Sequence, residues 1–353
     1  MTRRISAGAV AALLLLVSPQ HAAARERPLP PPTCLPELQV EIRRLAAAVG
    51  GVVGVTAAHL ESGESVSLNA RQRFPMASVF KLPIAMRLLH QVDRGQVSLD
   101  SSVAIARGDL RLGDSPITRH WRPGRTQTVR QLLEAMLVHS DNTAADLLLR
   151  VAGGPVSVDS RLRELGLDGG IRIDRSEADQ MLDFYGLRDG APPESEWSPQ
   201  MFVRLVEGVP DAARLTFARA WIEDPRDSAT PAAMCDLLAS VQRGEALEPA
   251  TTMLLLDCMQ RARTGHRRLR GLLPADTPVA HKTGTYGTTG GITAAINDAG
   301  LVTLPDGSHV AIAVFVKAST RGLDSIERGI ARISRATYDY WTQQGAAGAV
   351  SDP

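Results

Sequence analysis

The chain has 353 residues, of which 44% are hydrophobic and 22% are charged. This composition is typical of folded globular proteins and excludes a disordered or collagen-like chain, and the length predicts about two compact units or one large one. The 39 basic residues nearly balance the 38 acidic ones, so the charge gives no reason to expect a nucleic acid or an anionic surface as a partner.

The N-terminal residues have the order of a secretory signal peptide. Arg3 and Arg4 precede an apolar run over 7–17, and small residues follow at 22–24. The run is shorter than the ~20 apolar residues that span a bilayer. We therefore expect a signal peptide over 1–24 with cleavage near Ala24, and a Pro-rich leader over 25–34. The protein would be exported, either periplasmic or secreted, with no stable membrane anchor.

Hydrophobic spacing predicts the elements that follow. A helix over 35–49 comes first, and two strands over 52–60 and 65–69 follow it. Next comes a long series of helices, over 80–92, 128–138, 142–151, 155–165, 231–243 and 249–263. The period then changes to that of strands, over 279–285, 291–297 and 309–317, with a hairpin turn at 304–307 and a last helix over 323–342.

The order of these elements predicts the fold class. Strands from both ends of the chain have to share one sheet, so the helical middle is an insertion that forms a second lobe. We expect an α/β (α+β) two-lobed fold in which helices flank an antiparallel sheet. The α/β lobe would comprise 35–92 and 246–345, and the all-helical lobe 93–245. A site is expected in the cleft between the lobes.

The choice of basic residues indicates where proton transfer could take place. The chain contains 36 arginines but only three lysines, Lys81, Lys282 and Lys317. Arginine keeps its proton in proteins, whereas burial and neighbouring charges tune the pKa of lysine. Lys81 follows Ser78 by three residues, which places both side chains on one face of a helix, where a desolvated amine can activate the hydroxyl. The alternative is a capping serine beside a solvated lysine.

Two further short motifs carry reactive groups. Ser140-Asp141-Asn142 lies in a turn between two predicted helices, where a serine can pass a proton and an amide can both donate and accept hydrogen bonds. Its alternative is an ordinary helix cap. Lys282-Thr283-Gly284-Thr285 ends a predicted strand, where lysine and threonine can hold a carboxylate and the small glycine lets a substrate lie against the strand. Its alternative is a strand-end turn.

Together, in this order, the three motifs resemble those of the class A serine β-lactamases and the penicillin-binding proteins. The resemblance to the class A enzymes runs from about residue 35 to 341. It implies that Ser78 is the acylated nucleophile, that Lys81 is its proton partner and that Ser140 relays the proton to the leaving nitrogen.

The resemblance also implies a binding site for the substrate. Asn142 would contact the substrate amide, and Lys282, Thr283 and Thr285 would hold its carboxylate beside Gly284. The backbone N–H groups of Ser78 and Thr285 would form the oxyanion hole. Arg268 matches a position where some members of the family have a carboxylate-binding arginine, although a solvated basic run is the alternative.

The base that assists deacylation separates a lactamase from a penicillin-binding protein. In the family a glutamate follows an arginine by two residues in an omega-shaped loop, and Arg175-Ser176-Glu177 matches this pattern. Glu177 would activate the hydrolytic water, and a solvated loop acid is the alternative. Met181 stands where the family usually has an asparagine that helps to hold this water.

The omega loop is unusually long here, over 173–230. The aspartate that would pair with Arg175 is Asp227, so many inserted residues separate the two. A longer loop costs little free energy, only ~0.6 kcal/mol per doubling of its length. The inserted part is either a lid over the site or an external decoration, and helical runs over 199–207 and 211–222 are expected in it. Whether it permits efficient deacylation is left open.

Three residues lie outside these motifs. Asp114 stands where the family commonly has an aromatic residue at the mouth of the site, so its role is open. Cys235 and Cys258 fall in adjacent predicted helices and are either a disulfide or two buried thiols.

The resemblance implies a monomeric, exported β-lactam hydrolase without metal or cofactor, acting on a small β-lactam and not on nucleic acid. Ser78 would be acylated by the β-lactam amide, and Glu177 would assist hydrolysis of the acyl-enzyme. One alternative is a penicillin-binding-protein-like peptidase acting on D-Ala-D-Ala stems, and another is a β-lactam sensor or trap that acylates and stops. The preferred β-lactams remain open.

Overall fold

The computed structural model describes residues 34–113 and 115–350. The predicted signal peptide over 1–24, the predicted leader apart from Cys34, and Asp114 lie outside the described residues. Within the part of the chain that is described, no helix is long and apolar enough to cross a membrane.

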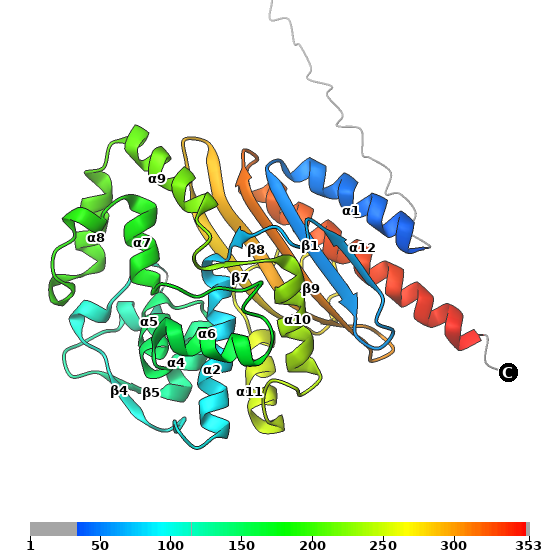
Figure 1. The fold of residues 1–353 in the computed structure, drawn as a ribbon, viewed down its shortest axis with the longest axis horizontal. Helices are drawn as coiled ribbons and strands as arrows, with labels where there is room; N and C mark the ends of the chain where they lie inside the picture. Colours follow the sequence, from blue (N-terminus) through cyan, green and yellow to red (C-terminus); the bar gives the residue numbers. More distant parts are fainter. Residues whose placement is uncertain (1–33, 114, 351–353) are drawn as a thin grey trace, which may run out of the picture. The chain divides into compact units, whose positions relative to one another are not determined.

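A five-stranded antiparallel sheet forms the centre, in the order β2–β1–β9–β8–β7 (Figure 1). Its strands are β1 (Val52–His59), β2 (Ser65–Leu68), β7 (Val279–Thr289), β8 (Ile292–Thr303) and β9 (His309–Ser319). β1 pairs with β9, with Val55 opposite Val314. Strands from the two ends of the chain therefore share one sheet, which confirms the predicted α/β fold class.

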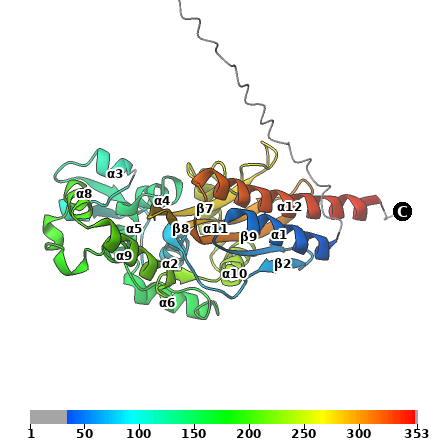
Figure 2. The same ribbon diagram turned by 90° about the horizontal axis from the view of Figure 1, so that it is seen from above.

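Helices cover both faces of this sheet. Because successive side chains of a strand point to opposite faces, β9 places Ile312 and Val314 in the core beneath α1 and α12, and Ala311 and Ala313 in the core on the other face. The first face is covered by α1 (Leu35–Val49) and α12 (Leu323–Val350), which lie side by side (Figures 1 and 2). The other face is covered by α10 (Pro231–Gln242).

A second group of helices lies beyond the β7 edge of the sheet (Figures 1 and 2). Here α2 packs against α4, α5, α6 and α11 around one large apolar core. The elements of this group are η1 (Ala77–Phe80), α2 (Lys81–Asp93), α3 (Pro116–Arg119), α4 (Val129–Val138), α5 (Asn142–Val151), α6 (Gly154–Glu164) and α11 (Pro249–Gln260). Two short strand pairs lie outside the central sheet, β3 (Phe74–Pro75) with β6 (Ser228–Ala229), and β4 (Ser102–Ala104) with β5 (Thr126–Thr128), the second of which contacts α4. The boundaries of the two predicted lobes stay a prediction.

The long loop between Arg175 and Asp227 is largely helical. It contains α7 (Glu177–Tyr185), η3 (Arg188–Gly190), η4 (Glu194–Glu196), α8 (Pro199–Glu207) and α9 (Asp211–Glu223). Both helical runs expected in the insertion are confirmed as α8 and α9, whereas α7 had not been predicted. Figure 2 shows α8 and α9 grouped with α3 and α5.

The two cysteines in the helices are free thiols. Cys235 on α10 and Cys258 on α11 are both buried and form no disulfide. Burial raises the pKa of the Cys235 thiol to about 12 and that of Cys258 to about 11. Of the two alternatives left open by the sequence, buried thiols are therefore correct.

Candidate active site

Ser78 and Lys81 lie where η1 meets the start of α2. The Lys81 Nζ donates a hydrogen bond to Ser78 Oγ at 3.0 Å. Lys81 is fully buried whereas Ser78 is half-buried, so the amine lies behind a hydroxyl that a substrate can reach. Burial lowers the pKa of Lys81 from its ordinary value, and nearby carboxylates oppose this only in part. The alternative of a solvated lysine is therefore wrong.

Ser140 lies between the two motif lysines. It occupies the turn between α4 and α5 with a φ of 59°, a left-handed conformation that is costly for a residue other than glycine. Its Oγ accepts hydrogen bonds from Lys81 Nζ at 3.3 Å and from Lys282 Nζ at 2.8 Å. The helix cap of α5 is Asp141, whose Oδ1 accepts the Ala144 N–H at 2.9 Å. The Ser140 hydroxyl is therefore not used as a cap and bridges two amines.

Asn142, in the first turn of α5, also binds the Lys81 amine. Its Oδ1 accepts from Lys81 Nζ at 2.6 Å, and its Nδ2 donates to the Leu112 carbonyl at 2.8 Å. Both ends of the amide are thus engaged, which fixes its orientation beside the lysine.

The edge strand β7 supplies the Lys-Thr-Gly-Thr motif. Lys282 is fully buried, and burial together with the charge of Lys81 lowers its pKa well below the ordinary value. The Thr283 Oγ1 lies 2.7 Å from Thr264 Oγ1. Thr285 is exposed, so it is the residue of this motif that a substrate reaches most directly.

Gly284 lets β7 approach the turn that carries Ser78. A Cβ atom on Gly284 would lie 2.4 Å from the Met76 carbonyl oxygen and 3.2 Å from the Ser78 nitrogen. The structure shows that the absence of a side chain at Gly284 makes room for the backbone around the nucleophile. The expectation that it makes room for a substrate stays a prediction.

Asn297, which was not predicted as a functional residue, fixes the same turn from β8. This fully buried amide donates to the carbonyls of Pro75 and Met76 at 2.8 and 3.0 Å, and it accepts the Val316 N–H at 3.1 Å. An amide side chain at the last position of the predicted strand over 291–297 was the available signal.

Arg268 is buried beside β7. Its Nη2 donates to Thr285 Oγ1 at 2.7 Å and its Nη1 to the Gly284 carbonyl at 3.0 Å, while Nε bonds Glu327 at 3.1 Å. Only 5% of the residue is exposed, so the alternative of a solvated basic run is wrong. The guanidinium lies directly behind the exposed Thr285.

Glu177 is the first residue of α7 and is also buried, with 4% of the residue exposed. Its Oε2 has no hydrogen-bond partner among the described residues. Burial raises the pKa of Glu177, and the positive charge of Lys81 opposes this shift in part. The alternative of a solvated loop acid is therefore wrong, and the carboxylate is available to bind a proton.

Asp146 and Arg111 hold Glu177 in place, and both were missed. Asp146 on α5 accepts the N–H groups of Glu177 and Ala178 at 2.6 and 3.1 Å. The buried Arg111 donates to Asp146 at 2.7 Å and to Glu194 at 2.7 Å. An acid on the apolar side of the predicted helix over 142–151 was the signal. Because Glu194 belongs to the inserted segment, the insertion is tied to the site and is not merely an external decoration.

The base of the long loop is closed by ion pairs. Arg175 Nε lies 2.5 Å from Asp227 Oδ2, as predicted, and Arg175 also pairs with Asp183 at 2.6 Å and Asp224 at 3.2 Å. Only 5% of the Arg175 residue is exposed. The segment between Arg175 and Asp227, which are 52 positions apart, therefore leaves the site and returns to it at a closed base.

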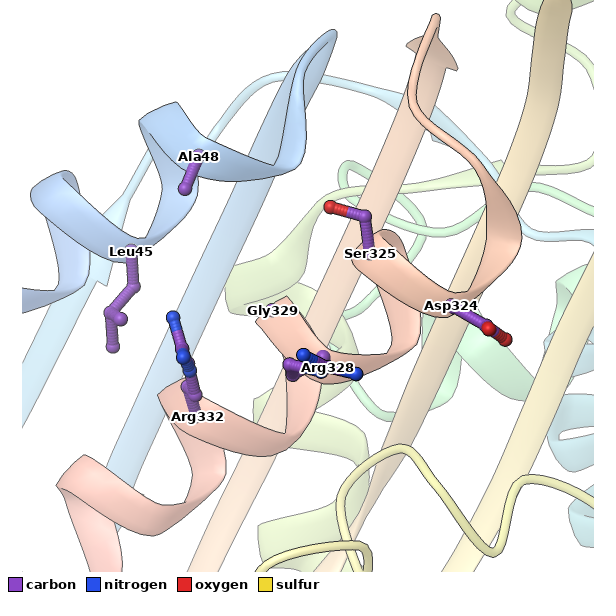
Figure 3. A pocket seen from close by; sticks show the side chains of 7 residues that line it. All are labelled: Leu45, Ala48, Asp324, Ser325, Arg328, Gly329 and Arg332. Carbon is purple, nitrogen blue, oxygen red and sulfur yellow. The ribbon is translucent and has the colours of Figure 1, made fainter. Parts of the chain in front are cut away.

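Two cavities lie outside this group of residues. One of about 350 Å³ lies between α1 and α12, where Arg328 and Arg332 line it (Figure 3). Another of about 470 Å³ lies between α7, α9 and the β7–β8 turn. None of the candidate site residues lines either cavity. Over residues 34–113 and 115–350, no three His, Cys, Asp or Glu side chains gather as metal ligands would.

Comparison with known proteins agrees with this geometry. A model of the β-lactamase enzyme family matches residues 37–341. The extended-spectrum β-lactamase PER-1 of Pseudomonas aeruginosa is 31% identical over 307 residues, which cover 86% of this chain and 87% of PER-1. The β-lactamase L2 of Stenotrophomonas maltophilia is 34% identical over 284 residues, or 80% of each chain.

Solved structures give the same result. A β-lactamase from Chitinophaga pinensis DSM 2588 has a TM-score of 0.72 and 35% identity, over 86% of this chain and 98% of that one. The TLA-3 extended-spectrum β-lactamase has a TM-score of 0.73 and 28% identity, over 88% of this chain and 100% of that one. The chain therefore belongs to the β-lactamase enzyme family and is a class A serine β-lactamase that hydrolyses β-lactams.

Proposed function

We propose that this enzyme hydrolyses β-lactams through an acyl-enzyme on Ser78, with Lys81 and Ser140 moving the proton during acylation and Glu177 assisting deacylation. The observation that carries the proposal is the continuous set of contacts from Ser78 Oγ through Lys81 Nζ and Ser140 Oγ to Lys282 Nζ. Such a chain of groups can accept a proton from the attacking nucleophile and give a proton to the leaving group.

Acylation follows from this set of contacts. Neutral Lys81 takes the Ser78 proton as Oγ bonds to the lactam carbonyl carbon, and the lactam C–N bond then breaks. Ser140 gives its proton to the leaving nitrogen and recovers one from Lys81. The lowered pKa of Lys81 supports this role, because it increases the fraction of neutral amine at pH 7. The N–H groups of Ser78 and Thr285 would bind the developing oxyanion, and removing one such donor costs ~3–4 kcal/mol in other enzymes.

Substrate binding is assigned to β7 and its neighbours. Lys282, Thr283, Thr285 and Arg268 would bind the substrate carboxylate beside Gly284, and Asn142 would contact the substrate amide. The support for Thr285 and Arg268 is their direct contact at 2.7 Å, which joins an exposed hydroxyl to a fixed positive charge.

Deacylation is assigned to Glu177. The ionised carboxylate takes a proton from water as the water oxygen bonds to the acyl carbon, and the ester bond to Ser78 Oγ breaks as Oγ regains a proton. The support is the buried, unpaired Oε2 and the anchoring of the Glu177 backbone by Asp146.

The test is intact-protein mass spectrometry of the mature chain mixed with benzylpenicillin and followed over time. We expect a transient adduct with continuing loss of substrate, no adduct with Ser78→Ala, and a persistent adduct with Glu177→Gln. Glu207→Gln, which changes an exposed glutamate of the same insertion, is the matched control and should behave as wild type.

Other outcomes would point to the alternative functions. A persistent adduct on the wild-type chain would indicate a sensor or trap that acylates and stops. Cleavage of D-Ala-D-Ala peptides that Ser78→Ala abolishes would indicate a peptidase. No adduct on the wild-type chain would contradict the roles assigned to Ser78 and Lys81.

We also propose that the protein is exported and acts as a monomer without a membrane anchor. The N-terminal pattern over 1–24 supports export. N-terminal sequencing of the exported protein should give a start near residue 25, and light scattering should give the mass of one chain.

A further inference from the structure

A buried glutamine on α7 has no hydrogen-bond partner in the part of the chain that the structure describes. Gln180 is fully buried, yet neither its Oε1 nor its Nε2 has a partner among the described residues. A buried amide without partners costs free energy, and such groups are normally satisfied by ordered water. Gln180 is therefore suited to bind a water molecule.

Glu177 lies on the same face of the helix as Gln180. The two residues are three apart on α7, which makes their side chains neighbours. Glu177 Oε2 is likewise buried and without a partner among the described residues. One acceptor and one amide, both unpaired, thus lie next to each other beside the group that is assigned to deacylation.

The contacts of Phe184 show which way this face of α7 is turned. Phe184 lies about two helical turns after Glu177, on the same face of α7. The centroid of its ring lies 4.8 Å from the centroid of the Tyr286 ring on β7. The same apolar cluster includes Ala77, the residue before Ser78. The face that carries Glu177, Gln180 and Phe184 is therefore turned toward β7 and the turn that carries the nucleophile.

The opposite face of α7 has a different role. Ala178 and Leu182 pack with Trp197 and Phe202 of the insertion in a separate apolar cluster. Met181 is not part of this cluster. It follows Glu177 by four residues and therefore lies beside it, where the family usually has a water-holding asparagine, but it is buried and offers only a thioether, a weak acceptor.

We propose that Gln180 takes the place of the absent asparagine and holds the hydrolytic water together with Glu177. This inference rests on the proposed function. The Gln180 Nε2 donates to the water oxygen, and Glu177 Oε2 accepts one of its protons. The water oxygen then bonds to the acyl carbon, the ester bond to Ser78 Oγ breaks, and Oγ takes up a proton.

The test compares Gln180→Leu with Met181→Leu, an apolar replacement of the adjacent residue. Rates of acylation and deacylation with benzylpenicillin are measured by rapid quenching and intact-protein mass spectrometry. We expect Q180L to slow deacylation by roughly ten- to a hundredfold, since small misplacements of a reacting group have effects of this size. Acylation should change less than about threefold, and M181L should match wild type in both steps.

Thermal stability separates this role from a structural one. Q180L breaks no hydrogen bond to a described residue, so we expect its melting temperature not to fall while deacylation slows. Adding Met181→Asn to Q180L should restore part of the deacylation rate, because position 181 follows Glu177 by four residues on α7 and an amide there lies next to the carboxylate.

Three results would distinguish the possible failures. Deacylation of Q180L at the wild-type rate would overturn the inference. Loss of the fold in Q180L would also overturn it, because Gln180 would then support the structure. A wild-type chain that forms no adduct, or that never releases it, would instead contradict the proposed function itself.

Discussion

Gly284→Ala tests whether β7 must touch the nucleophile's turn. The added Cβ would lie 2.4 Å from the Met76 carbonyl oxygen, 3.1 Å from the Ala77 Cβ and 3.2 Å from the Ser78 nitrogen, whereas such contacts are essentially never shorter than 3.0 Å. The oxygen and the nitrogen belong to the backbone and cannot rotate away. The strand and the turn must therefore separate by at least about 0.6 Å.

This separation acts on the reaction more strongly than on the fold. Inserting a methyl group into a packed site costs typically ~1–3 kcal/mol of stability. A displacement near 1 Å can reduce a rate by ~10²-fold. Because the proposed oxyanion donors lie on the two displaced segments, Ser78 on the turn and Thr285 on β7, we expect kcat/KM to fall by roughly ten- to a hundredfold.

The assay is the hydrolysis of a chromogenic cephalosporin, together with a thermal melt. Gly287→Ala is the matched control on the same strand, because its added Cβ would meet nothing within 4 Å. The control should keep the wild-type kcat/KM. A folded G284A enzyme with an unchanged kcat/KM would refute the reasoning that β7 and the turn are in tight contact.

Three further predictions follow from the buried groups. Burial raises the pKa of Glu177 above its value in the unfolded chain. The wild-type protein therefore loses stability as the pH rises from the unfolded-state pKa of this group to its higher folded-state pKa. Glu177→Gln should therefore melt higher than wild type at pH 7, with a smaller difference at pH 4, and an equal difference at both would contradict this. Asp227→Asn leaves the buried Arg175 without its 2.5 Å partner, so we expect a loss of ~3 kcal/mol in a denaturant titration; a loss below ~1 kcal/mol would show that the other carboxylates suffice. Cys235 and Cys258, whose pKa values burial raises to about 12 and about 11, should resist iodoacetamide at pH 8 until the protein is unfolded. Rapid labelling of either in the native protein would contradict their burial.

Much of the architecture could be predicted from local patterns. The helix over 35–49 is confirmed as α1, and the hairpin turn at 304–307 joins β8 to β9 with Gly307 at a φ of 87°. These features depend on hydrophobic period and turn residues that lie next to each other in the chain. The pairing of Arg175 with Asp227 was predicted across 52 residues and is confirmed, because the family resemblance supplied the partner.

The strand β8 was predicted to end at 297 but continues to Thr303. Asn297 and Asp298 resemble a strand end in the sequence, but both are fully buried in the sheet. Asn297 binds the turn before Ser78, and Asp298 lies 2.9 Å from His281 Nδ1. Polar side chains that would stop a strand in water are accepted in the interior when they are hydrogen-bonded.

Ser78, Lys81 and Ser140 could be recognised as candidate reactive residues from the sequence alone, because the spacing of the motifs and the scarcity of lysine are visible there. The three-dimensional structure was needed to show that Asp146 holds the backbone of Glu177 and that the amide of the buried Gln180 has no partner within the described residues. The physical reason is that burial and hydrogen bonding depend on which distant segments meet. The residue type sets the chemistry that a side chain can carry out. The fold determines whether water, a charged group or a backbone group lies within its reach.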